Sequence, residues 1–91
     1  MTSKTSFLEK AGSTDILLIL LTKKKMYISE LKNELDKGSM STLNTRVREL
    51  KTLGLIEDKQ EYIKGTHRKY IWLTEKGRNI AKLILKIEKL L

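Results

Sequence analysis

Cysteine and proline are absent from this chain of 91 residues, and histidine occurs once, as His67. Without cysteine no disulfide can form, and one histidine alone cannot supply the usual thiolate and imidazole ligands of structural zinc. We therefore expect no metal site and no cofactor. The lack of cysteine is also consistent with a reducing compartment such as the cytosol.

Long apolar segments are absent too. The longest apolar run, Ile16 to Leu21, has six residues, whereas a helix needs about 20 to cross a bilayer. The segment Met1 to Ala11 is polar and lacks the apolar core of a signal peptide. These features predict one small, soluble, intracellular domain with no membrane partner.

Arrangements typical of catalysis are missing as well. Carboxylates are scattered along the sequence, no nucleophile motif joins serine, histidine and aspartate, and no glycine-rich loop of the phosphate-binding type occurs. His67 has no partner for acid–base work, so we interpret it as a loop residue near phosphate or water. We expect a protein that is not an enzyme.

Positive charge is what the chain has in excess. Lysine and arginine number 19 against 11 aspartates and glutamates, which gives a net charge of +8. Such a charge favours polyanionic partners, above all nucleic acid. A lysine-rich surface of the kind common in thermophilic proteins is the alternative explanation.

The first predicted helix begins at Ser13 and runs to about Thr22. Ser13 and Thr14 are small oxygen-bearing caps, and Asp15 places an acid in the first turn. Its residues Ile16 to Leu21 are apolar around the whole circumference. Such a helix must be covered on more than one side.

A helix-turn-helix is predicted for residues 29–53. Ser29 caps its first helix, and in the turn Asp36 to Ser39 that follows, Gly38 can take the left-handed conformation and Ser39 can cap the second helix. The second helix spans roughly residues 40–53 and has an apolar stripe at helical spacing. This stripe consists of Met40, Leu43, Val47 and Leu50.

A β-hairpin and a final helix are predicted for the rest of the chain. One strand reaches about Ile63, the return strand covers Lys69 to Leu73, and the loop between them is Lys64 to Lys69. Thr74 then caps a helix that can run to Leu91.

The face opposite the buried stripe of the second helix carries the side chains that read base edges in a major groove, which are short hydrogen-bonding groups and arginine. Arg48 is the best candidate for a bidentate contact with guanine, while Arg46 and Lys51 lie nearer the rim, where phosphates would be. The candidate DNA-binding residues here are Ser39, Ser41, Thr42, Asn44, Thr45, Arg46, Arg48 and Lys51. An ordinary solvated helix face is the alternative.

The hairpin loop gathers further cations, and Arg68 could enter a narrow minor groove. The candidate DNA-binding residues of the loop are Lys64, Thr66, His67, Arg68 and Lys69. Any exposed hairpin tip could have a similar composition.

The last helix has a broad apolar stripe. Together with the apolar first helix, it exceeds what one small core can cover, so a second copy of the chain is the simplest partner. The alternative is that both helices pack on the chain's own three-helix core. The candidate dimer-interface residues are Ile80, Leu83, Ile84, Ile87 and Leu91.

Two segments resemble known regulators. The first, Thr42 to Leu50 followed by Leu53-Gly54-Leu55-Ile56, resembles the recognition helix and its exit in winged-helix regulators. The second, Arg68 to Gly77, is similar to the second wing strand and "leucine–threonine–x–lysine–glycine" helix start of MarR, PadR and related archaeal regulators. The resemblance implies the order helix, strand, two helices, two strands and a dimerising helix. It also implies that the second helix of the helix-turn-helix faces the groove and that Lys64 to Lys69 belong to a wing. The chain lacks the extra helices that form effector pockets in full-length MarR proteins, so we expect no small-molecule effector.

We therefore predict an α+β winged helix, with a three-helix core, a two-stranded wing and a C-terminal helix. Residues 1–12 form a flexible or partly helical N-terminus and residues 13–91 form the domain, with the wing at 57–73 and the dimerisation helix at 75–91. The predicted function is sequence-specific binding of double-stranded DNA by a homodimeric transcriptional regulator that is cytoplasmic and nucleoid-associated. The alternatives are a protein-interaction module and a non-specific nucleoid-type DNA binder.

Overall fold

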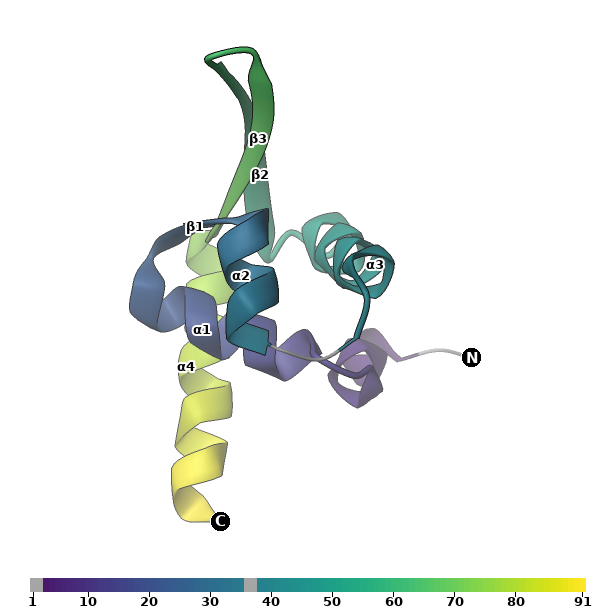
Figure 1. Ribbon diagram of the computed structural model, residues 1–91. Helices are drawn as coiled ribbons and strands as arrows, with labels where there is room; N and C mark the ends of the chain where they lie inside the picture. Colours follow the sequence, from purple (N-terminus) through teal and green to yellow (C-terminus); the bar gives the residue numbers. More distant parts are fainter. Residues whose placement is uncertain (1–2, 36–37) are drawn as a thin grey trace.

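The computed structural model describes residues 3–35 and 38–91, and Figure 1 shows how its elements are arranged. Their bounds are η1 (a 3₁₀-helix) Lys4–Glu9, α1 Ser13–Lys23, β1 Lys25–Tyr27, α2 Ile28–Leu35, α3 Met40–Thr52, β2 Ile56–Ile63, β3 Thr66–Leu73 and α4 Glu75–Leu90. This order confirms the predicted α+β winged-helix fold. The strand β1 between the first two α-helices is the one that the resemblance implied.

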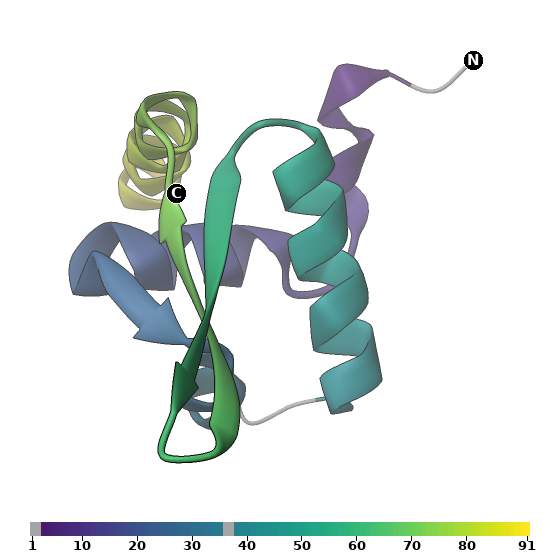
Figure 2. The same ribbon diagram turned by 90° about the horizontal axis from the view of Figure 1, so that it is seen from above.

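Helix α1 lies at the centre of the core. Ile16, Leu17 and Leu20 are fully buried, and the other three apolar residues of the run pack half-buried against the same core. α1 contacts η1, the other three α-helices, β1 and β3, and Figure 2 shows it crossing behind the hairpin. Its all-round apolar surface is therefore largely covered within the chain, contrary to the expectation that one core would be too small to do so.

Helix α3 buries Leu43, Val47 and Leu50 of the predicted stripe. The fourth member, Met40, was wrongly predicted to be buried, because 38% of its surface is exposed. As the first residue of α3 it lies beyond the edge of the core, where it lines a surface hollow between the helix-turn-helix and the hairpin.

Two predicted helix caps are wrong. The residue that caps α1 is Gly12, with φ +88° and no side-chain hydrogen bond, while Ser13 is buried as the first residue of the helix. Ser29 lies inside α2, and the start of that helix is satisfied instead by Glu30, whose Oε1 accepts the backbone N–H of Tyr27 at 2.9 Å.

The cap of α3 is confirmed. Ser39 has extended backbone, and its Oγ accepts the backbone N–H of Thr42 at 3.1 Å. Gly38, just before it, has the expected left-handed conformation with φ +76°. Asp36 and Lys37 of the predicted turn lie outside the described residues.

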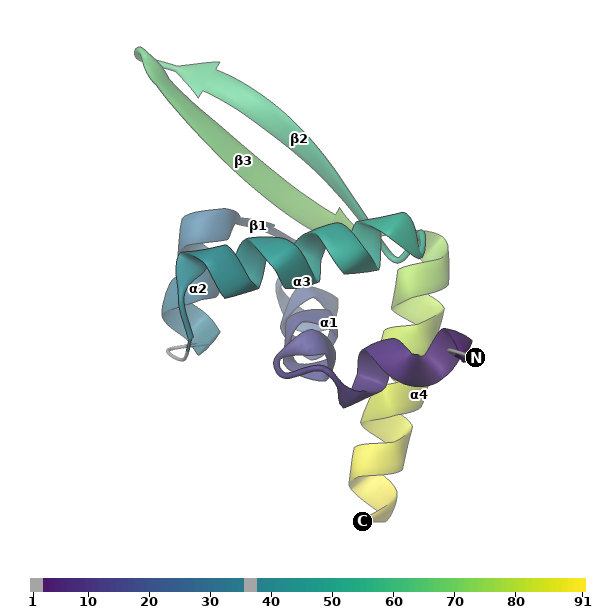
Figure 3. The same cartoon turned by 90° about the vertical axis from the view of Figure 1, so that its right-hand side faces the viewer.

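The hairpin turns more tightly than predicted. β2 and β3 pair antiparallel from Ile56 opposite Leu73 to Ile63 opposite Thr66, so the loop is the pair Lys64-Gly65 and not the six residues expected. Both turn residues have positive φ, +50° and +79°. Two-residue turns with this backbone match the natural twist of paired strands, and pairing therefore continues almost to the tip. Figures 1 and 3 show the hairpin projecting from the body.

The exit of α3 and the start of α4 meet in one close contact. Thr74 caps α4 by accepting the N–H of Gly77 at 3.0 Å, and its hydroxyl donates to the Gly54 carbonyl at 2.6 Å. Its backbone N–H donates to the carbonyl of Leu55 at 3.1 Å. A Cβ at residue 77 would overlap that same carbonyl, so only glycine permits this approach.

Gly77→Ala should destabilise the protein by roughly 1–3 kcal/mol, because the methyl group has no space against the Leu55 backbone. Alanine would otherwise favour a helix over glycine by about 1 kcal/mol. Asn79→Ala, at an exposed position of the same helix, is the matched control and should be neutral or stabilising. Urea unfolding of the three proteins measures the difference, and an alanine at 77 that stabilises the chain would contradict the contact.

Candidate nucleic-acid interface

The outer face of α3 carries the side chains that the sequence assigned to DNA. Ser41, Thr42, Asn44, Thr45 and Arg48 are all exposed. Thr45 donates its hydroxyl hydrogen to the Ser41 carbonyl at 3.0 Å, and Thr42 is hydrogen-bonded to Ser39 at 3.1 Å. Within the described residues, the side chains of Asn44 and Arg48 form no hydrogen bond or ion pair, so these two residues can offer all of their donors and acceptors to a partner.

Arg46 points back to the protein instead of outward. Its Nε donates to the carbonyl of Ala11 at 3.2 Å, and its guanidinium pairs with Glu49. Glu49 also pairs with Lys10, whose Nζ is 3.0 Å from Oε2, and these partners, Lys10 first, lower the pKa of the Glu49 carboxyl. The network ties α3 to the N-terminal segment, so Arg46 is engaged within the chain and not free at the rim, where the sequence suggested a phosphate contact.

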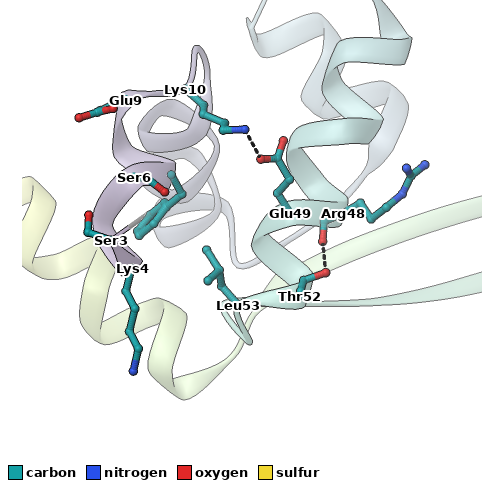
Figure 4. Close-up of a pocket in the computed structure, with 10 residues that line it drawn as sticks. Ser3, Lys4, Ser6, Glu9, Lys10, Arg48, Glu49, Thr52 and Leu53 are labelled. Atoms are coloured by element: carbon teal, nitrogen blue, oxygen red, sulfur yellow. Dashed lines mark hydrogen bonds and ion pairs between the residues drawn. The ribbon is translucent and has the colours of Figure 1, made fainter. Parts of the chain in front are cut away.

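A hollow of about 690 Å³ lies between η1 and the C-terminal half of α3. Figure 4 shows Lys10 reaching toward Glu49 at its edge, while the guanidinium of Arg48 points away. Phe7 and Leu53 provide part of its lining. Arg48 is also among the lining residues, so this hollow adjoins the candidate DNA face.

Asp58 connects the end of α3 to the hairpin. Its Oδ1 lies 2.8 Å from the Nζ of Lys51, and its Oδ2 lies 3.2 Å from the Nζ of Lys69. The hydrogen bond from Lys51 is the largest cause that lowers the pKa of Asp58, and Lys69 adds to it. The same contact raises the pKa of Lys51. Two of the three candidate DNA-binding lysines, Lys51 and Lys69, are thus held by one carboxylate in the free chain.

Sequence reasoning assigned no role to Asp58. On β2 it lies opposite Ile71, two residues from Lys69 on the neighbouring strand, which is a diagonal pair on one face of the sheet. The sequence alone could have given this pair only if the hairpin register had been known. The tighter turn was needed to define that register.

The cations of the hairpin lie mainly on β3 and not on a loop. Because side chains alternate along a strand, His67 and Lys69 share one face, while Arg68 lies on the other. His67 packs against Tyr62 with ring centroids 4.8 Å apart, and the guanidinium of Arg68 lies 4.8 Å from the centre of the Tyr27 ring. Aromatic contacts of this kind hold the two side chains in place. Of the other candidate residues, Lys64 is in the turn and Thr66 begins β3, and both are exposed.

A basic groove runs between α3 and the hairpin, which Figures 2 and 3 show side by side. One hollow, of about 420 Å³, is lined by Asn44, Arg48, Lys51, Asp58 and Lys69. A second, of about 430 Å³, continues toward the tip and shares Asn44 and Lys69 with the first. The structure thus brings together the two groups of DNA-binding candidates that the sequence placed on separate elements.

The last helix presents a separate apolar surface. Ile84 is only 9% exposed and packs in the chain's own core, where Ile80 is partly buried. Leu83 and Ile87 are 60% and 56% exposed, and Leu90 and Leu91 beyond them are also exposed. Figure 1 shows this end of α4 extending away from the body. The exposed face is therefore narrower than the predicted stripe, since it lacks Ile80 and Ile84.

Among residues 3–35 and 38–91, no helix has the length and apolar character needed to cross a membrane. The same residues contain no cluster of three or more histidine, cysteine, aspartate or glutamate side chains suited to a metal ion.

Comparison with known proteins places the geometry in a family. The model of the HxlR-like helix-turn-helix family matches residues 13–91. A transcriptional regulator homologue from Pyrococcus horikoshii OT3 is similar in structure, with a TM-score of 0.81 and 25% sequence identity over 96% of this chain and 85% of that one. No curated protein sequence matches significantly.

Two further solved structures share the fold. A possible HxlR family transcriptional factor from Thermoplasma volcanium GSS1 has a TM-score of 0.84 and 21% identity, covering 98% of this chain and 78% of that one. The quinone-bound YodB from B. subtilis has a TM-score of 0.76 and 20% identity, covering 94% and 88%.

Asp58→Asn should lower the free energy of unfolding at neutral pH by about 0.5–1 kcal/mol, because two ion pairs at the protein surface are lost. The folded-state pKa of Asp58 lies below its ordinary value of 3.8. The stabilisation by the two ion pairs is therefore complete above pH 3.8 and decreases as the pH falls below it. It vanishes below the folded-state pKa, where the carboxyl is protonated in both states. Urea unfolding of both proteins, from neutral pH to about pH 2, measures this convergence. A difference that stays constant on acidification would show that the ion pairs are not its cause.

Proposed function

The chain belongs to the HxlR-like helix-turn-helix family, and we propose that it is a homodimeric transcriptional regulator that binds a specific sequence in double-stranded DNA. α3 enters the major groove with Asn44 and Arg48 toward the base edges, and the hairpin follows the backbone as a wing. The observation that carries the proposal is the exposed polar face of α3, which joins the basic side of the hairpin in one groove.

The chemistry of the two exposed side chains fits base recognition. Asparagine can bond both N6 and N7 of adenine, and arginine can bond both O6 and N7 of guanine. Asn44 and Arg48 are four residues apart and so lie one above the other on a helix face. They are preceded by Ser41, whose short side chain allows the start of α3 to approach the bases closely.

The wing supplies contacts that position the protein without reading sequence. Lys64 and Thr66 at the tip and His67 on β3 are exposed and can meet phosphate oxygens, which accept most protein–DNA hydrogen bonds. Arg68, stacked on Tyr27, is the candidate for a narrow minor groove.

Pairing of two chains uses the exposed end of α4. Leu83, Ile87, Leu90 and Leu91 remain in water in the single chain, and burying each leucine or isoleucine is worth roughly 1.5–3 kcal/mol. A two-fold pair of this kind presents two copies of α3 to half-sites about one DNA turn apart, roughly 34–36 Å.

We propose neither a catalytic activity nor a small-molecule effector for this chain, although YodB is described in a quinone-bound form. A regulator of this kind works in the cytoplasm, on the nucleoid.

Arg48→Ala should cost roughly 1–3 kcal/mol of binding to a sequence selected from a random duplex pool, and should relax the preference at one base pair. Lys82→Ala removes one charge from an exposed position of α4 and serves as the control. Gel-shift titrations of both variants decide the role of Arg48, and equal, small losses in the two would remove it from the base-reading face. Equal affinity of the parent for selected and random duplex would identify a non-specific binder, and no binding even at low salt would favour a protein-interaction module.

Replacing both Leu83 and Ile87 by glutamate should give monomers, since the charges would be buried at the apolar interface. The variant lowers the net charge by two, so the control replaces Lys86 and Lys89 by glutamine and changes the charge equally. Sedimentation at micromolar concentration should show a dimer for the parent and the control. A monomeric parent would exclude this pairing.

A further inference from the structure

Asp58 is the one carboxylate that lines the hollow between the end of α3 and β3, within the residues that the structure describes. It faces Lys51 from α3 and Lys69 from β3, at 2.8 Å and 3.2 Å, with a different oxygen toward each. Arg48 and Asn44 complete the lining. Asp58 itself is mostly covered, with 17% of its side chain exposed, whereas both lysines are 40% exposed or more.

This arrangement has the chemistry of a phosphate site that already holds an anion. A DNA phosphodiester offers one negative charge on two free oxygens, and it is bound by lysine as a point charge. The carboxylate of Asp58 offers the same charge on two oxygens to the same two ammonium groups. It also cancels one of the three positive charges that Arg48, Lys51 and Lys69 bring to the hollow.

We propose that Asp58 is an intramolecular substitute for a DNA phosphate, and that it determines specificity by reducing the affinity of the groove for DNA backbone alone. The inference rests on the proposed function. A phosphate that approaches Lys51 and Lys69 must displace or oppose the carboxylate, so backbone contacts by themselves gain little. At the correct sequence, the base contacts of α3 compensate for that cost, and the two lysines move to the backbone.

The exposure of the lysines makes this exchange feasible. Ion pairs between exposed groups contribute little stability, and both ammonium groups can move on flexible stems without leaving the groove. If Asp58 served only to hold α3 against the hairpin, its replacement would have the opposite effect. The groove would loosen, and binding to every DNA sequence would weaken.

The test compares the parent with Asp58→Asn on random duplex and on a duplex selected by the parent, over a series of salt concentrations. The variant should bind random duplex about three- to tenfold more tightly at low salt, as expected for release of two weak ion pairs. Its affinity should fall more steeply with salt, by about one unit of logarithmic slope or more. The gain on the selected duplex should be smaller, so the specificity ratio decreases.

Two further proteins make the result specific to this site. Glu88→Gln has the same change in net charge at an exposed position near the end of α4, where an acid gains nothing from the helix dipole, and it should leave binding nearly unchanged. Adding Lys51→Gln and Lys69→Gln to the Asp58→Asn variant should abolish the gain. Thermal unfolding at neutral pH confirms that each variant is folded.

The outcomes separate this inference from the function on which it rests. If the parent binds duplex but Asp58→Asn binds random DNA equally or more weakly, the substitute role is wrong and the proposed function stands. An equal gain in Glu88→Gln would reduce the effect to net charge and would likewise overturn it. If neither the parent nor any variant binds DNA at low salt, the proposed function itself fails.

Discussion

The contact between Gly77 and the carbonyl of Leu55 determines how the three working parts of the molecule are oriented. The residues that leave α3 and the residues that enter α4 meet there, and Thr74 bonds to both Gly54 and Leu55. Since β2 begins at the next residue, Ile56, the hairpin starts from the same point. A side chain at residue 77 would separate α4 from the exit of α3, and the angles between α3, the hairpin and α4 would then change together.

Some charged side chains of the candidate DNA surface are paired within the chain, and others are free to contact a partner. Arg46 is bound to Glu49 and to the N-terminal segment, and Lys51 and Lys69 are bound to Asp58, whereas Asn44 and Arg48 point outward. The net charge of +8 already includes these acids, but the pairs reduce the number of cations that are free to approach a polyanion. If Asp58 acts as proposed, the same pairs that favour the folded chain also oppose contacts with DNA backbone, so selectivity increases while affinity decreases.

The sequence predicted what depends on local pattern. The stripe Leu43, Val47 and Leu50 of α3 and the caps Ser39 and Thr74 follow from spacing and capping chemistry within a few residues, whereas the strand β1 came from the family resemblance. Two local predictions, the caps Ser13 and Ser29, were wrong, and the other misses depend on neighbours distant in the chain or on backbone geometry. Arg46 meets a carbonyl 35 residues away, and periodicity shows which way a helix face points but not what lies opposite it. Lys64 takes a positive φ that a lysine rarely adopts, so the residue types of the loop did not reveal a two-residue turn. Ile84 and Ile87 lie on the same stripe, but Ile84 is buried and Ile87 is exposed. This difference depends on where α1 packs along α4, which the stripe does not reveal.

The tight turn also sets a length. β1 pairs only with residues 70–72 of β3, which lie opposite residues 57–59 of β2. Beyond them the hairpin continues through Gln60 to Ile63, which is about 13 Å of extended strand. Successive base pairs rise about 3.4 Å along a duplex. In a DNA complex of the proposed kind, an arm of this reach laid along the axis would cover about four base pairs outside those read by α3. The footprint of each half-site would then be set as much by the length of a hairpin as by the helix that reads the bases.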